Sequence, residues 1–254
     1  MMTLKSNDRP TVLLTGFGPF PSVGANATSV LVPRIAEAAR RGHPGIAFVA
    51  HVLPTEWEAS LDLVDALIWQ HKPVVALHFG VSGRATGFEI ETRGRNRCCL
   101  SADAAGRLPV GDCLTPGGPE FLPATWPAAQ IVARLRRRGL PAQISRDAGG
   151  YLCNALLYRS LEIARRLGSP MRSGFVHLPA ALVNERRPSI EPRLGLKLGW
   201  DDVVDGSLEI VGAALGRPSV RRAVRDGLPR ESGRGWAKGP SVGVIEPRRH
   251  LSVG

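Results

Sequence analysis

The chain has 254 residues, of which 43% are hydrophobic, 22% are charged and only 6% are aromatic. Its 33 Lys and Arg residues against 22 Asp and Glu residues give a formal net charge of +11 at pH 7. A chain of this length can bury a sizeable core, and it contains no run of about 18 apolar residues of the kind that a membrane-spanning helix needs. Collagen, coiled-coil, wholly disordered and transmembrane proteins are therefore excluded.

Short apolar runs that end at glycine or polar residues alternate along the chain with stretches of helical period. Such runs are typical of buried parallel strands. The predicted strands cover residues 11–15, 46–53, 73–79, 141–145 and 174–179. The predicted helices cover residues 30–41, 55–68, 128–138, 148–167 and 200–215. We expect Ser29 to cap the first helix and a hairpin to form within residues 88–98. This alternation predicts an α/β fold in which helices cover both faces of a mostly parallel sheet.

A single domain at residues 11–215 accounts for all the periodic segments. We expect a flexible N-terminus at residues 1–10, where no apolar segment typical of a secretory signal is found. Residues 216–254 are rich in Gly and Pro, and nine basic against three acidic residues lie between 217 and 254. We predict a basic, disordered tail there. Because no groove-reading motif accompanies its charge, we expect neither a nucleic-acid partner nor a membrane partner.

The four cysteines, Cys98, Cys99, Cys113 and Cys153, lack the CxxC spacing of zinc sites and the density of a disulfide scaffold. This pattern favours reduced thiols and a cytoplasmic protein. No group of His, Cys, Asp and Glu residues has the spacing of metal ligands in the sequence. We therefore predict no metal and no cofactor.

Two candidate catalytic residues lie beyond the carboxyl ends of predicted strands, where open parallel sheets bind their ligands. Cys153 comes early in a helix that opens with glycines, where the helix dipole and free N–H groups favour a thiolate and could hold an oxyanion. His177 lies near a strand end, where a general base would be placed. Both residues also fit a purely structural role in the core, and His78 is a rival base at another strand end.

Glu89 and Glu91 share one face of a strand-like segment, because residues two apart on a strand point the same way. Either carboxylate could orient the imidazole of His177. Both also fit a solvated strand face with Arg93 and Arg95 as partners. The residues by themselves indicate a thiol hydrolase.

Four motifs occur in order along the chain: LLTGFGPF at 13–20, PGGP at 116–119, SRDAGGYLCNALLY at 145–158 and GFVHLP at 174–179. Together they resemble the motifs of pyroglutamyl peptidase type I, the pyrrolidone-carboxylate cysteine peptidases. The resemblance implies a single-domain, three-layer αβα sandwich around a twisted sheet. It also implies a homo-oligomer that hydrolyses N-terminally pyroglutamylated peptides.

The resemblance implies a role for each residue at a matching motif position. Cys153 is the nucleophile and His177 its base. Glu91 rather than Glu89 orients His177, because Asn96 follows Glu91 at the spacing found in the family.

The same resemblance implies that Phe17 and Phe20 form the aromatic walls of the lactam pocket and that Asn26 belongs to that region. Val81 stands near the place of a family Gln, and Ser101 near the place of a family Arg. Two alternatives therefore stay open: a related thiol amidohydrolase with altered specificity, and a non-catalytic relative that binds a peptide or metabolite.

Overall fold

The computed structural model describes residues 9–19, 26–180, 182 and 198–219. Most of both expected flexible ends, residues 1–8 and 220–254, lie outside the described residues. Among the helices of the described part, none has the length and apolar content that crossing a membrane requires.

Six strands form the central sheet, in the spatial order β2-β1-β3-β8-β4-β7. They are β1 (Thr11–Phe17), β2 (Ala47–Leu53), β3 (Val75–Ser82), β4 (Phe88–Glu91), β7 (Ala142–Ser145) and β8 (Arg172–Pro179). The strands β2, β1, β3 and β8 are mutually parallel, whereas β4 is antiparallel to β8 and parallel to β7. The predicted mostly parallel sheet is confirmed.

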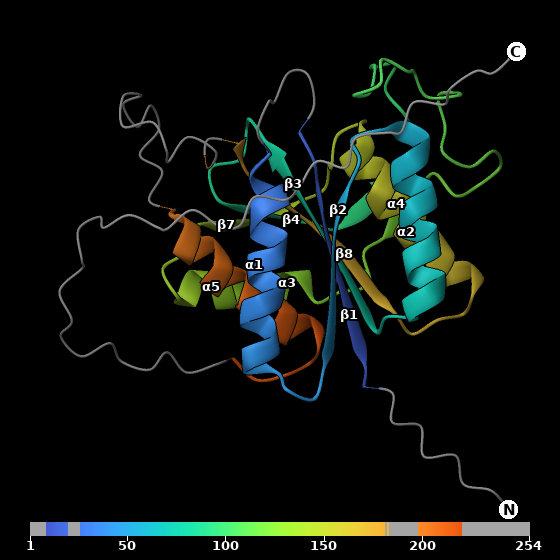
Figure 1. Cartoon of the computed structure of the whole chain (residues 1–254). Helices are drawn as coiled ribbons and strands as arrows, with labels where there is room; N and C mark the ends of the chain where they lie inside the picture. Colours follow the sequence, from blue (N-terminus) through green and yellow to red (C-terminus); the bar gives the residue numbers. More distant parts are fainter. Residues whose placement is uncertain (1–8, 20–25, 181, 183–197, 220–254) are drawn as a thin grey trace, which may run out of the picture. The chain divides into compact units, whose positions relative to one another are not determined.

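Helices cover both faces of this sheet (Figure 1). One face carries α1 (Ala27–Gly42), α3 (Ala128–Arg137) and α5 (Trp200–Ala214), and the other carries α2 (Trp57–His71) and α4 (Leu152–Arg166). The alternation of β1 explains the two cores, because Val12 and Leu14 join the first cluster while Leu13 joins the second. The three-layer αβα arrangement is therefore confirmed.

Two local expectations differ from the structure. The segment 88–98 forms no hairpin: β4 enters the central sheet, while β5 (Arg93–Arg95) pairs with β6 (Phe121–Pro123) in a separate ribbon. The N-cap of α1 is Asn26 rather than Ser29, because the Asn26 side chain accepts a hydrogen bond from the Thr28 amide at 3.1 Å. An Asn side chain is a strong N-cap, so the helix begins earlier than its apolar period indicates.

Candidate active site

A buried ion pair joins His177 on β8 to Glu91 at the end of β4. The distance between His177 Nδ1 and Glu91 Oε1 is 2.8 Å, and both side chains are buried. The antiparallel pairing of β4 with β8 creates this contact, because it sets Glu89 opposite His177 and leaves Glu91 two residues further along the same face. Trp126 fixes the end of the strand by donating a hydrogen bond from Nε1 to the Glu91 carbonyl at 3.0 Å.

Cys153 lies in the first turn of α4 and lines the same cavity as His177. It is close enough to the imidazole to raise the pKa of His177. The N-cap residue, Tyr151, offers no side-chain cap to this helix. The first amides of any α-helix lack partners within the helix, so the start of α4, where Cys153 lies, is suited to bind an anion.

The thiol and the imidazole open into one cavity of about 400 Å³. Segments after β3 and β7 complete its walls. The cavity therefore lies at strand ends, where the active site was expected. The lining includes Val81, Arg84, Glu89, Tyr151, Cys153 and His177. Tyr151 packs edge-on against Trp57 with ring centroids 5.0 Å apart, which holds one wall in place. Tyr151 directly precedes α4 in the sequence, and this position is the signal that would have identified it as a residue of the cavity.

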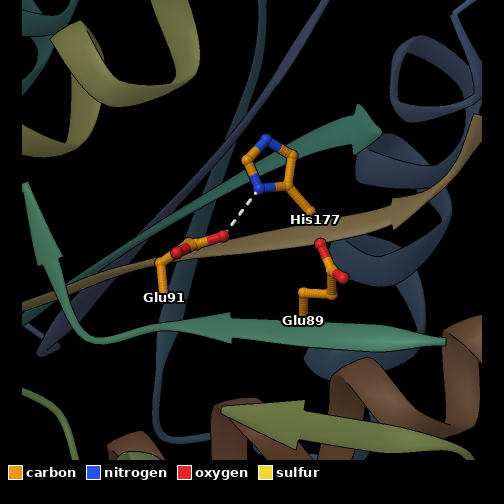
Figure 2. Close-up of side chains that lie close together, drawn as sticks. All are labelled: Glu89, Glu91 and His177. Carbon is orange, nitrogen blue, oxygen red and sulfur yellow. Dashed lines mark hydrogen bonds and ion pairs between the residues drawn. The ribbon is translucent and has the colours of Figure 1, made fainter. Parts of the chain in front are cut away.

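The electrostatics of the site favour a charged imidazole. Burial by itself would lower the pKa of His177, but the negative charge of Cys153 and hydrogen bonds to Cys153 and Glu91 raise the pKa to about 10. Both ring nitrogens of a charged imidazole are donors, so Nδ1 donates to Glu91 Oε1 (Figure 2). The arrangement is suited to an imidazolium beside a thiolate, which is the pair that thiol hydrolysis requires.

The structure separates the rival residues from this site. His78 is fully buried in the middle of the sheet, its Nδ1 is 2.8 Å from Thr15 Oγ1, and burial lowers its pKa to about 3. It does not line the cavity that holds Cys153. Glu89 does line this cavity, but its Oε1 accepts a hydrogen bond from Gln143 Nε2 at 2.9 Å, and it is Glu91 that bonds His177.

Of the residues expected in the lactam pocket, Phe17 and Asn26 make structural contacts in the described part of the chain. Phe17 is 3% exposed and packs in the core beneath α2 and α4. Asn26 is engaged as the cap of α1, where its Oδ1 also accepts from the Thr28 hydroxyl at 2.8 Å. Phe20 lies outside the described residues.

Comparison with known proteins places these features in a family context. The model of the pyroglutamyl peptidase family matches residues 10–190. A pyrrolidone-carboxylate peptidase of Gloeobacter violaceus is 36% identical over 176 residues, which cover 66% of this chain and 80% of the relative. A second, from Cupriavidus taiwanensis, is 32% identical over 219 residues, which cover 85% of this chain and 97% of the relative. The crystal structure of pyroglutamyl peptidase I from Bacillus amyloliquefaciens superposes with a TM-score of 0.71 and 28% identity, covering 81% of this chain and 97% of that one.

Proposed function

Because the chain belongs to the pyroglutamyl peptidase family, we propose that it is a cysteine omega-peptidase that removes N-terminal pyroglutamyl residues from peptides. Cys153, His177 and Glu91 carry the reaction. The observation that supports this assignment best is the buried His177–Glu91 pair at the wall of the cavity that also holds the Cys153 thiol.

Each of the three side chains has a separate task. The Cys153 thiolate attacks the carbonyl carbon that links pyroglutamate to the next residue, and the oxygen of that carbonyl becomes an oxyanion near the free amides at the start of α4. The His177 imidazolium gives its proton to the leaving amine. It then takes a proton from the water that hydrolyses the thioester, and the thiolate is regenerated as the acid product leaves.

Glu91 orients the imidazole rather than reacting itself. Its Oε1 accepts a hydrogen bond from Nδ1 and so keeps the other ring nitrogen available to Cys153 and the leaving group. A buried carboxylate also stabilises the imidazolium, because burial alone would favour the neutral form of the ring. The end of β4 holds Glu91 rigidly, because Trp126 bonds the carbonyl of this same residue.

A pyroglutamyl group fits a neutral pocket, since the lactam ring carries no charge and no free amine. Val81, beside the thiol, gives the cavity an apolar contact near the place where the family has Gln. A homo-oligomer and a cytoplasmic location stay predictions from the sequence.

A fluorogenic pyroglutamyl coumarin amide tests the proposal. The wild-type protein should release the fluorophore, and Cys153→Ser should lower kcat/KM at least about a thousandfold, because the alkoxide needed for attack is not formed at neutral pH. Cys113→Ser is the matched control, since it removes a thiol that does not line the cavity with His177 and should retain activity.

The same assay, with alanyl and prolyl coumarin amides added, separates the alternatives. Faster turnover of one of these amides would indicate an amidohydrolase of altered specificity. Binding of pyroglutamyl peptides without any turnover would indicate a non-catalytic relative. Undiminished turnover by Cys153→Ser would exclude the thiol mechanism.

A further inference from the structure

A second cavity, of about 700 Å³, holds three cysteines that have no task in the mechanism above. Cys98, Cys99 and Cys113 line this cavity, whereas Cys153 does not. All of these cysteines are free thiols in the structure. The Cys98 residue is only 7% exposed, while Cys99 and Cys113 are partly exposed. The cavity therefore presents a buried thiol together with two that small molecules in solution can reach.

The backbone brings Cys98 and Cys113 side by side. The amide of Cys98 donates a hydrogen bond to the carbonyl of Asp112 at 2.7 Å, and Cys113 follows Asp112 directly in the chain. Backbone segments that share such a hydrogen bond lie about 5 Å apart. A disulfide needs Cα atoms about 4.4–6.8 Å apart, so the backbone contact sets the two cysteines at a separation that a disulfide can span.

The electrostatics of the cavity couple the same two thiols. Burial, followed by the negative charges of Cys113, Cys99 and Asp112, raises the pKa of Cys98 to about 11. The effect of Cys113 exceeds that of Cys99, although Cys99 is the next residue in the chain. Cys113 is therefore the closer electrostatic partner of Cys98. Because Cys98 keeps its proton near pH 7, Cys113 is the thiol of the pair that reacts first.

We propose that Cys98 and Cys113 form a reversible disulfide when the protein meets a small-molecule disulfide, for which oxidised glutathione is the probe. The Cys113 thiolate attacks one sulfur of the probe, the S–S bond of the probe breaks, and one glutathione leaves as a thiolate. Cys98 then loses its proton to solvent and attacks the Cys113 sulfur, which expels the second glutathione. Two electrons pass from the protein thiols to the probe, which is reduced to two thiols.

The disulfide closes the segment 98–113, which supports a wall of the proposed active site. The Cys99 amide donates to the Gly150 carbonyl at 2.7 Å, and the Tyr151 hydroxyl donates to the Ala102 carbonyl at 3.2 Å. Gly150 and Tyr151 both line the cavity of the proposed active site. Oxidation therefore fastens the two ends of the segment that holds this wall, and reduction releases them. Formation of the disulfide does not depend on the proposed function.

Peptide mapping by mass spectrometry tests the disulfide. The Cys153→Ala variant serves as the background, because it lacks the thiol of the proposed active site. The protein is incubated with oxidised glutathione, its remaining thiols are blocked with iodoacetamide, and it is digested with trypsin. Trypsin cleaves after Arg97, Arg107 and Arg134, so peptide 98–107 should be found joined to peptide 108–134.

Variants in the same background identify the cysteine within peptide 98–107. Cys99→Ser is the matched control, since this neighbouring thiol lines the same cavity, and the joined peptides should persist in it. Cys98→Ser and Cys113→Ser should each abolish them. Cys113 is partly exposed, so Cys113→Ser gives an answer even where Cys98→Ser unfolds the protein. Loss of the joined peptides in Cys99→Ser, or a glutathione adduct on Cys113 that never closes to a disulfide, would overturn the proposal.

Thermal unfolding tests whether the disulfide fits the native fold. The oxidised Cys153→Ala protein should melt about 5–10 °C above the reduced protein, because the cross-link limits the freedom of the unfolded chain. Dithiothreitol should return the melting temperature to that of the reduced protein. Cys113→Ser in this background should melt at the same temperature under both conditions. A melting temperature that does not rise when the peptides are joined would show that the disulfide distorts the native fold, against the proposal.

Discussion

Gly80 makes room for the Cys153 thiol. It lies opposite His177 in the pairing of β3 with β8, under the first turn of α4. A Cβ atom at this position would come within 3.0 Å of Cys153 Sγ and 2.7 Å of the Phe175 ring. No other residue type fits here without moving the thiol or the ring.

We predict that Gly80→Ala lowers kcat/KM about a hundredfold while the protein stays folded, because displacement of a reacting atom by about 1 Å has effects of this size. Gly83→Ala is the matched control, since a Cβ there meets nothing within 4 Å. Both variants would be compared by coumarin amide turnover and by circular dichroism. Full activity in Gly80→Ala would show that the thiol works from a different position.

At the scale of residues, the sequence predicts the positions of the catalytic side chains better than it predicts how side chains pack. The position of Cys153 at a helix start and of His177 near a strand end follow from local pattern. The burial of Phe17 depends on contacts with distant elements. The capping role of Asn26 is local, because its side chain accepts hydrogen bonds from Thr28 two residues further on. The neutral state of His78 likewise follows from burial in a sheet centre, which no local pattern reveals.

At the scale of elements, the decisive feature is the reversed direction of β4 and β7. Alternating strands and helices predict parallel pairing, and four of the six strands obey it. The segment between β3 and β4 is too short to hold a crossover helix, so β4 returns antiparallel beside β8. Only this reversal lets Glu89 and Glu91 face His177 across one strand pair. The sequence supplies the residues of the site, whereas the pairing that joins them is a tertiary property.

A second feature at this scale is the end of α5, where the chain continues to contact the domain. The buried Arg134 donates to the Arg217 carbonyl at 2.7 Å, and Arg217 Nη1 lies 3.2 Å from His43 Nδ1. Ser219 donates to Glu209 at 2.7 Å. The sequence analysis assigns Arg217 and Ser219 to the tail, but their hydrogen bonds join them to the helical layer.

We therefore predict different results for two truncations. A chain that ends after Ser219 should keep the wild-type melting temperature and turnover. A chain that ends after Leu215 should lose about 1–3 kcal/mol of unfolding free energy, because the buried Arg134 guanidinium loses an acceptor. Its turnover at low temperature should persist, since the cavity residues lie on other elements. Denaturant unfolding and the coumarin assay measure these effects. Equal stability of both truncations would show that residues 216–219 contribute nothing.

At the scale of the whole molecule, His78, which is buried in the central sheet, makes the stability of the fold depend on pH. Burial holds the pKa of His78 at about 3, compared with 6.5 for an exposed imidazole. Between these values the unfolded chain binds a proton that the native protein does not. Acidification from pH 6.5 toward pH 3 therefore favours unfolding, by up to about 1.4 kcal/mol per pH unit for this one group.

The double variant Thr15→Val/His78→Leu should remove this dependence. It replaces both members of a buried polar pair with apolar side chains, and it also removes the His78 Nε2 atom that has no partner among the described residues. We expect its unfolding free energy to equal or exceed that of the wild type at pH 7 and to fall less steeply between pH 6.5 and pH 4, as measured by urea unfolding at a series of pH values. Turnover at pH 7 should be retained, because His78 does not line the cavity of Cys153. Parallel acid profiles for the two proteins would show that His78 takes up its proton while the sheet is still folded.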